Sequence, residues 1–286
     1  MPSTSYHMHL PDVATSCVVF ASPHSGSDYP WTFLRSTVLD ALTIRSSEDA
    51  FVDRLFDCVP QFGAAFLEAG APRAYIDLNR ACDELDPALI EGVRKAGNNP
   101  RVASGLGVVP RVVAHGRAIY HGKISRNEAD MRIDRIWKPY HDRLAALLDH
   151  SREQFGSSIL LDCHSMPHEA VRHTRHKGAP PQIVIGDRFG ASAAPEVVEQ
   201  VEAAFERAGL RVARNAPFAG AYTTQQYGRP SQSQHAIQIE IDRSIYMDEA
   251  SVRPNSNFKP FCKLLRGVIA DLVVIGQRPS RALAAE

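Results

Sequence analysis

The stretch Ser157-Ser-Ile-Leu-Leu-Asp-Cys-His-Ser165 decides the fold of this 286-residue chain. Its short apolar run, bounded by polar residues, predicts a buried strand. Further strands are predicted on both sides of it. They cover SCVVFAS (16–22), AYIDLN (74–79), QIVIGD (182–187), LRVARN (210–215) and HAIQIEID (235–242).

Helical stretches alternate with these strands. Apolar residues at helical spacing predict helices over 46–59, 127–155, 194–209 and 257–274. Ser46 and Asp49 can form a capping box, and Pro139 predicts a kink. Residues 91–125, 166–181 and 217–234 are expected to be mostly loop, and AAFLEAG (64–70) is expected to end before the second strand. This alternation predicts one α/β domain over residues 1–286 with a mostly parallel sheet.

Composition excludes several classes of protein. Apolar residues make up 44% of the chain, and Lys plus Arg equals Asp plus Glu at 32 each, so no net charge attracts nucleic acid or an anionic membrane. The five cysteines show no CxxC spacing, which favours reduced thiols in a cytoplasmic protein. The N-terminus lacks the apolar core of a signal peptide, and no run is long enough to span a bilayer. The oligomeric state stays open.

The residues that follow the predicted strands suggest a metal site. Open α/β sheets bind ligands beyond the carboxyl ends of their strands. His24 follows the first strand and His164 the strand over 157–165. Two histidines with a carboxylate and one open position are the usual composition of a catalytic zinc site. The hypothesis is one divalent ion, with zinc favoured, held by these two residues; the alternative is a pair of buried structural histidines.

The third ligand has two candidates, Asp49 and Glu48, at the start of the helix predicted over 46–59. Asp49 is preferred. The alternative is that both carboxylates only cap the helix and interact with its dipole. Asp162 lies two residues before His164 and therefore points to the same face, where it could orient the imidazole.

Glu240 is the candidate general base. In HAIQIEID it lies on the face opposite Ile237, Ile239 and Ile241, and a carboxylate on an interior strand is costly unless it is paired or functional. The alternative is a structural ion pair with Arg243 or Arg111.

Asn79 and Arg80 are the candidate anchors for a substrate carboxylate. The planar guanidinium of Arg80 suits a carboxylate, and Asn79 adds a polar contact. The alternative is a salt bridge from Arg80 to Asp83 or Glu84, which follow directly in the chain.

Nine motifs in order resemble the N-formylglutamate amidohydrolase (deformylase) family. They are SPHSGSDYP, SEDAFVDRLFD, APRAYIDLNRACDELDP, GLGVVPR, RIDRIWKPYH, LLDCHSMP, IVIGDRFG, PFAGAYTTQQYG and QIEIDRSIYMDE. The resemblance implies a central mixed sheet between helices, as in the zinc exopeptidases with their phosphorylase/hydrolase-like fold. It implies metal-dependent hydrolysis of N-formyl-L-glutamate to formate and L-glutamate, the last step of one route of histidine degradation.

The resemblance also implies roles for individual residues. It supports His24 and His164 as ligands with an acidic third ligand in SEDAFVD. The DLNR of residues 77–80 resembles the carboxypeptidase element in which Asn and Arg hold the substrate carboxylate, and Glu240 resembles the carboxypeptidase base. Ser27 stands where carboxypeptidases place a metal-binding Glu. Candidates for a second substrate carboxylate are Arg111, Tyr222 and Arg243.

Three rival functions remain. One is a deformylase or deacylase acting on another N-acyl amino acid. Another is a thiol amidase using Cys163 beside His164, which is disfavoured because adjacent strand residues point to opposite faces. The third is a small-molecule binding homologue without activity. His168, His173 and His176 lie in a polar loop that is more simply solvated than metal-binding.

Overall fold

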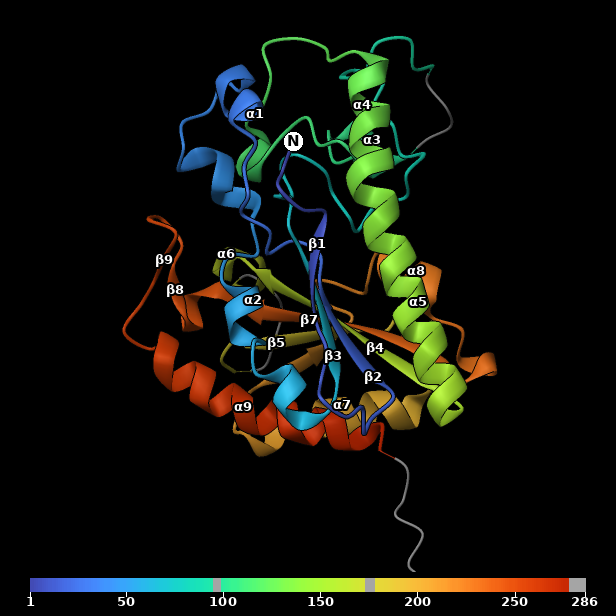
Figure 1. Cartoon of the computed structure of the whole chain (residues 1–286). Helices are drawn as coiled ribbons and strands as arrows, with labels where there is room; N and C mark the ends of the chain where they lie inside the picture. The colour runs from blue at the N-terminus through green and yellow to red at the C-terminus, as the bar shows by residue number, and fades with distance from the viewer. Residues whose placement is uncertain (95–98, 173–177, 278–286) are drawn as a thin grey trace, which may run out of the picture.

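A seven-stranded sheet lies at the centre of the computed structural model, which describes residues 1–94, 99–172 and 178–277 (Figure 1). The strands stand in the order β1, β3, β2, β4, β7, β5, β6. Their bounds are Tyr6–His9 for β1, Val18–Ser22 for β2, Ala65–Ala69 for β3, Ser158–Met166 for β4, Ile183–Gly186 for β5, Val212–Arg214 for β6 and Gln234–Asp242 for β7.

The sheet is mixed and mostly parallel, which confirms the predicted fold class. β3, β2, β4 and β7 run parallel to one another, while β1 is antiparallel to β3 and β5 is antiparallel to β7. Because β2, β4 and β7 are parallel neighbours, their carboxyl ends meet at one edge of the sheet. The residues that follow these strands are thereby brought together.

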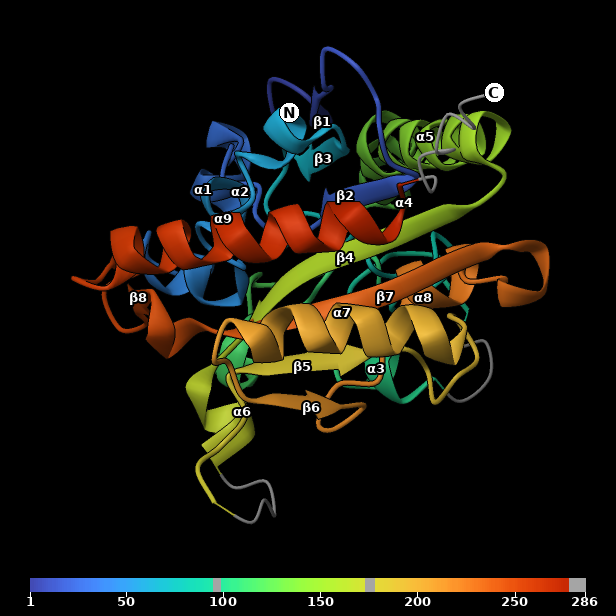
Figure 2. The same cartoon turned by 90° about the horizontal axis from the view of Figure 1, so that it is seen from below.

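Helices cover both faces of the sheet (Figures 1 and 2). On one face lie α7 (Pro195–Arg207) and α9 (Phe258–Ile275), and on the other lie α5 (Lys138–Phe155) and α8 (Tyr222–Tyr227). β2 shows why both faces need cover. Val18 and Phe20 pack into the core under α7 and α9, whereas Val19 and Ala21 pack into the core under α5.

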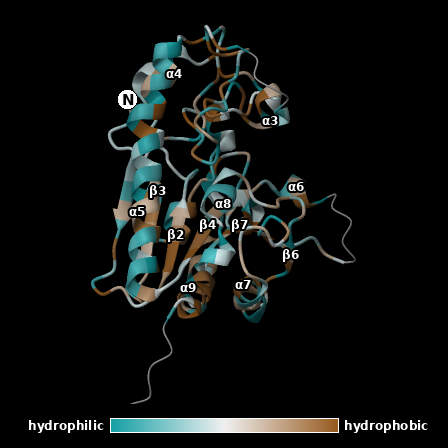
Figure 3. Cartoon of the chain, turned by 90° about the vertical axis from the view of Figure 1, so that its right-hand side faces the viewer, coloured by the Kyte–Doolittle hydropathy of each residue, from teal (hydrophilic) through white to brown (hydrophobic). Residues whose placement is uncertain are grey.

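Hydropathy follows the same layers (Figure 3). The inner strands of the sheet and α9 are hydrophobic, whereas α4 and α5 carry hydrophilic residues on the side in view. In α9 the buried side chains recur every three or four positions, from Phe258 and Phe261 to Leu265, Val268 and Leu272. This spacing places one apolar stripe against the sheet, as expected for a surface helix.

The predicted strand over 74–79 is wrong. These residues form turns. The backbone N–H of Tyr75 donates to the carbonyl of Pro72 (2.9 Å), and the backbone N–H of Asp77 donates to the carbonyl of Val108 (2.8 Å). The strand is β3, within the AAFLEAG segment. Its Ala, Leu and Glu residues are good helix formers, but pairing with β1 on one side and β2 on the other outweighs that local preference.

The helix predicted over 46–59 is also wrong in extent. A 3-10 turn covers Thr43–Ser47, and the α-helix α2 is limited to Val52–Leu55. Phe51 has a positive φ of 67° and separates the two. The capping box does not form, since Ser46 donates to the carbonyl of Thr43 and the Asp49 side chain points into the site described below. Tertiary contacts of Asp49 replace the local cap.

Asp53, in α2, gives a prediction about stability. Burial, together with the nearby Glu68, raises the pKa of Asp53 to about 6. A raised carboxyl pKa stabilises the fold below the unfolded value of about 3.9, and that stabilisation is lost as pH rises through 6. Asp53→Asn is therefore expected to raise the free energy of unfolding by roughly 1–2 kcal/mol at about pH 8 and by almost nothing at about pH 4. Urea unfolding at both pH values measures this, and an equal gain at both contradicts it.

The long helix over 127–155 is present but not continuous. α4 (Arg126–Arg132) and α5 are joined by a π-helical turn over Ile133–Trp137. Pro139 follows directly and has no N–H for the carbonyl of Arg135, which accounts for the irregular turn where a kink was predicted. The turn directs Trp137 inward, where its Nε1 donates to the carbonyl of Arg80 (2.9 Å).

The predicted loops contain short elements. Residues 91–125 include α3 (Pro100–Ala103), the loop after β4 includes α6 (His168–Arg172), and α1 (Trp31–Ser36) precedes the first 3-10 turn. A small ribbon of β8 (Met247–Asp248) and β9 (Arg253–Pro254) precedes α9. His173 and His176 lie outside the described residues. No helix in the described ranges has the length and hydropathy of a membrane span.

Candidate metal centre and active site

A cavity of about 740 Å³ opens at the carboxyl ends of β2, β4 and β7. Its walls come from segments far apart in the sequence, including the turns after β2 and β3, the segment around α3 and residues 217–221. His24, Asp49, Asn79, Arg80, His164, Glu240 and Arg243 all line it. Seven of the nine candidate site residues therefore share one cavity.

Three of these residues form a compact buried group. His24, Asp49 and His164 are each at most 2% exposed, and their ligand atoms lie within 4.8 Å of one another. Asp49 Oδ2 lies 2.9 Å from Nδ1 of His164 and 3.4 Å from Nδ1 of His24. The two Nδ1 atoms thus converge on one carboxylate oxygen.

Two further carboxylates fix how the imidazoles are oriented. His24 Nε2 lies 2.7 Å from Asp77 Oδ1, and His164 Nε2 lies 3.0 Å from Asp162 Oδ2. A carboxylate only accepts hydrogen bonds, so both Nε2 atoms carry a hydrogen, and the two Nδ1 atoms are the ones that would offer a lone pair to a cation once His164 has released its second proton. This carboxylate–histidine arrangement is the one that orients metal-binding histidines in proteins.

The group fits a tetrahedral ion. Nδ1 of His24 is buried and makes no hydrogen bond of good geometry with any described residue. Ligand atoms about 2.1 Å from a tetrahedral zinc lie roughly 3.4 Å apart, which is the separation of Asp49 Oδ2 from His24 Nδ1, whereas His164 Nδ1 lies closer, at 2.9 Å. The orphaned nitrogen, the fixed tautomers and the two-histidine, one-carboxylate donor set all agree with a metal centre.

The charges around the group favour a bound cation. Burial acts to raise the pKa of Asp49, but the hydrogen bond from His164 and the close contacts with both imidazoles outweigh it and hold that pKa well below its usual range. Burial acts to lower the pKa of His164, but Asp162 and Asp49 raise it well above its ordinary value. A proton on His164 therefore balances the carboxylates, and a cation would replace that proton.

Glu240 faces the same group from β7. It is 7% exposed and lies opposite His164 in the β4–β7 register. Burial is the main cause that raises its pKa to about 7, and Asp49 adds to the effect. Neither arginine considered as a structural partner of Glu240 pairs with it in the described residues, because Arg243 pairs with Asp49 and Arg111 pairs with Asp86. A buried carboxyl that titrates near neutrality suits general base catalysis.

Arg80 is held rigidly at the cavity wall. Its Nε donates to the carbonyl of Leu106 (3.0 Å) and its Nη1 to the carbonyl of Asn79 (2.8 Å). These contacts replace the salt bridges to Asp83 or Glu84 that were the structural alternative. Neither contact uses Nη2, and together they fix the orientation of the planar guanidinium. This arrangement suits the binding of a carboxylate.

Of the three residues considered for a second carboxylate, only Arg243 lines the cavity. Its Nη2 donates to Asp49 Oδ1 (2.9 Å), so it positions the carboxylate that faces the histidines. Arg111 lies outside the cavity lining because Asp86 holds its Nε at 2.8 Å. Tyr222 is also outside that lining, since its ring packs against Trp137 and His141.

Two other candidate residues, Glu48 and His168, have partners outside the histidine group. Glu48, the second choice for the third ligand, pairs with Arg45 and accepts a hydrogen bond from Tyr29, so it does not join the histidine group. His168 places its Nδ1 2.8 Å from Asp242 Oδ2 at the start of α6.

Among the cavity residues that sequence reasoning did not propose for the site are Arg73, Asp77, Arg101 and Gln238. Asp77 stood in the predicted strand AYIDLN, so its approach to His24 was hidden by that error. Arg73 precedes the same stretch and donates to Asp77 Oδ2 (3.1 Å). Gln238 carried a usable signal, because it shares the face of Glu240 on an interior strand.

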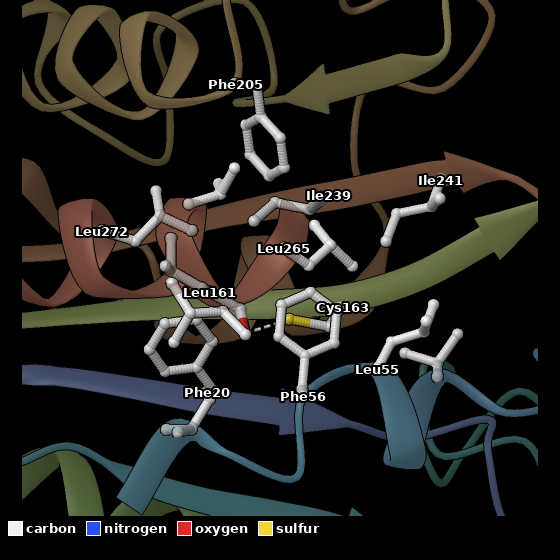
Figure 4. Close-up of a cluster of buried hydrophobic side chains, with 14 of the residues drawn as sticks. Phe20, Leu55, Phe56, Leu161, Cys163, Phe205, Ile239, Ile241, Leu265 and Leu272 are labelled. Atoms are coloured by element: carbon white, nitrogen blue, oxygen red, sulfur yellow. Dashed lines mark hydrogen bonds between the residues drawn. The ribbon is translucent and has the colours of Figure 1, made fainter. Parts of the chain in front are cut away.

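Cys163 is on the opposite side of β4 from this cavity. Figure 4 shows its sulfur among Phe56, Leu265 and other core side chains, with its contact to the carbonyl of Leu161 at 3.4 Å. Burial raises the pKa of its thiol well above the ordinary value. A neutral thiol facing the apolar core is no nucleophile for a ligand near His164.

Cys163→Ala is therefore expected to keep kcat and KM for amide hydrolysis within about twofold, because the thiol does not reach the cavity. The free energy of unfolding should fall by about 1 kcal/mol, since a small apolar group is lost from the core. Steady-state kinetics and urea unfolding measure both. A loss of activity with unchanged stability would revive a thiol mechanism.

Comparisons with known proteins agree with the motifs. A model of the N-formylglutamate amidohydrolase family matches residues 16–247. The chain is 29% identical over 262 residues to N-formylglutamate deformylase of Pseudomonas aeruginosa, covering 90% of this chain and 91% of that protein. It is 30% identical over 237 residues to N-formylglutamate deformylase of Pseudomonas putida, covering 81% and 82% respectively.

The fold agrees as well. The crystal structure of N-formylglutamate amidohydrolase from Ralstonia eutropha superposes with a TM-score of 0.86 at 33% identity, covering 94% of this chain and 96% of that one. The family model covers most of the chain, and the matched range contains every residue that lines the cavity. The chain is thus a member of the N-formylglutamate amidohydrolase family.

Proposed function

We propose that this chain hydrolyses N-formyl-L-glutamate to formate and L-glutamate, as one step of histidine degradation. The observation that carries the proposal is the convergence of His24, Asp49 and His164 in one cavity with Glu240 and Arg80. The relatives named N-formylglutamate deformylase support the choice of substrate.

The proposed cofactor is one divalent ion, with zinc favoured, held by His24, Asp49 and His164. Such an ion supplies Lewis acidity, which polarises a carbonyl and acidifies water. Asp77 and Asp162 orient the two histidines, and Arg243 orients Asp49.

In the proposed mechanism Glu240 removes a proton from the water that attacks the formyl carbon. It then returns the proton to the nitrogen of the departing glutamate. Its pKa of about 7 allows both transfers near neutral pH. The low polarity that raises this pKa also strengthens the electrostatic contacts of the site.

Arg80 is proposed to hold one carboxylate of the substrate. Arg101 is proposed for the other, because it lines the same cavity; the pKa of Arg80 is lowered mainly by burial, and Arg101 lies near enough to add to that effect. Two neighbouring cations match a dianionic ligand better than a monoanionic one.

The proposal extends to the whole chain. Residues 1–286 are proposed to form one catalytic domain, since β1, before the matched range, is an edge strand of the same sheet and α9, after it, covers one face. All five cysteines are free, which supports a cytoplasmic location.

The proposal is tested by metal analysis of the purified protein together with a formate-release assay. Activity that depends on about one equivalent of zinc and favours N-formyl-L-glutamate over N-formyl-L-aspartate and N-acetyl-L-glutamate is expected. Preference for another of these substrates would identify the rival deacylase. No hydrolysis of any of the three and no bound metal would identify a binding protein instead.

Arg80→Met gives a prediction on substrate binding. Loss of a charge-assisted contact of roughly 1.5–3 kcal/mol should raise KM for N-formyl-L-glutamate about 10- to 100-fold. The bound metal should remain, because Arg80 does not touch the histidine group. Arg135→Met, an exposed arginine of the π-helical turn, is the control and should leave KM unchanged. An unchanged KM in Arg80→Met contradicts the anchor role.

A further inference from the structure

Glu240 lies at the end of a series of three hydrogen bonds that begins on α8. The backbone N–H of Thr223 donates to Asn79 Oδ1 (2.8 Å), and Asn79 Nδ2 donates to Gln238 Oε1 (3.4 Å). Gln238 Nε2 then donates to Glu240 Oε1 (2.8 Å). All four residues are at most 7% exposed.

The series has a fixed direction. A backbone N–H can only donate, so the oxygen of Asn79 must face Thr223 and its NH₂ group must face Gln238. The oxygen of Gln238 must then face Asn79, which leaves its NH₂ group for Glu240. A reversed amide at either position would set two donors or two acceptors against each other in a buried site. That would lower the ratio of folded to unfolded protein by roughly fivefold or more. Thr223 therefore determines that Glu240 meets a donor.

We propose that Asn79 and Gln238 are positioning residues that orient the carboxylate of Glu240 for proton transfer. The inference rests on the proposed function, since it takes Glu240 as the base. It assigns Gln238 a role in the reaction, and it moves Asn79 from substrate binding to positioning.

The contacts of Asn79 support this reassignment. Its oxygen accepts from Thr223, and its nitrogen lies 3.4 Å from Gln238 Oε1 and 3.5 Å from Asp162 Oδ2, both of which accept. Both polar atoms of the side chain are thus occupied inside the protein. Arg80 alone, of this neighbouring pair, has a polar group left for a ligand.

The three hydrogen bonds from Thr223 to Glu240, here called the relay, also connect Glu240 to a wall of the cavity. Residues 217–221 line the cavity, and Thr223 follows them within the first turn of α8. The position of this segment therefore sets the position of the donor that begins the relay.

The test uses the metal-loaded full chain and the N-acyl amino acid that gives the highest rate among the three substrates above. Gln238→Met removes both polar atoms, and Gln238→Glu keeps the shape but removes the donor. Both are expected to lower kcat about 10- to 100-fold, the usual effect of losing a partner of a catalytic group, with KM within about threefold. The zinc content should be unchanged.

A matched control is Gln234→Met at the start of the same strand. Gln234 donates to the carbonyl of Tyr227 (2.8 Å), far along β7 from Glu240, so its loss should lower stability but not kcat. Asn79→Leu should lower kcat like Gln238→Met. A KM that rises in Asn79→Leu while kcat is unchanged would restore the substrate-binding role and overturn the inference.

A double-mutant cycle separates this inference from the proposed function. If Gln238 acts only through Glu240, Gln238→Met should have almost no further effect on kcat in a Glu240→Gln background. An equal fold-loss in both backgrounds would overturn the relay while leaving Glu240 as the base. Full activity of Glu240→Gln alone would overturn the base itself, and with it the relay.

Discussion

Replacing His164 with alanine is expected to remove the bound metal and nearly all hydrolytic activity. His164 Nδ1 is one of the two imidazole nitrogens that converge on Asp49 Oδ2, and alanine has no atom that could replace it. Loss of Lewis-acid stabilisation worth several kcal/mol corresponds to a drop in kcat/KM of about 10³-fold or more. Metal analysis and formate release on the same sample measure both effects.

The neighbouring Asp162 supplies a graded variant. Asp162→Asn keeps the ligand but weakens the contact that fixes its tautomer, so metal affinity should fall about 10- to 100-fold and excess zinc should restore activity. Excess zinc should not restore His164→Ala. His150→Ala, an exposed histidine of α5, is the control and should behave as the parent protein. Normal turnover and normal zinc content in His164→Ala would contradict the metal centre.

Proton competition adds a pH dependence to the same site. Asp162 and Asp49 raise the pKa of His164 although burial opposes them, so the metal-free group binds a proton strongly. Metal binding must displace that proton, and zinc affinity is therefore expected to weaken as pH falls. A site whose ligands were already deprotonated would show no such dependence on pH over this range.

Much of this site could be predicted from the sequence because parallel strands bring their carboxyl ends together. β2 and β4 are marked by apolar runs and β7 by alternating isoleucines, and these patterns place His24, His164 and Glu240 at one edge. Chemistry then suggests which of the polar residues there could bind a metal. Neither step needs side-chain geometry.

The parts that sequence could not predict depend on contacts between distant segments. β3 is a strand because β1 and β2 pair with it, although its residues favour a helix. The Asp49 side chain does not cap a helix, because it contacts His24, His164 and Arg243 instead. Arg111 was plausible as a ligand for a carboxylate until Asp86, 25 positions away, proved to hold it.

Glu240→Gln is expected to lower kcat about 10²- to 10⁴-fold, because the amide cannot take a proton from water. Zinc content should be unchanged, since Glu240 does not belong to the histidine group. The parent enzyme should lose kcat/KM as pH falls through the pKa of Glu240, which burial raises to about 7 and which a bound cation would lower. This acid limb should be absent from the residual activity of Glu240→Gln. Glu199→Gln, an exposed residue of α7, is the matched control. A Glu240→Gln variant that keeps both its rate and its acid limb would show that another group accepts the proton.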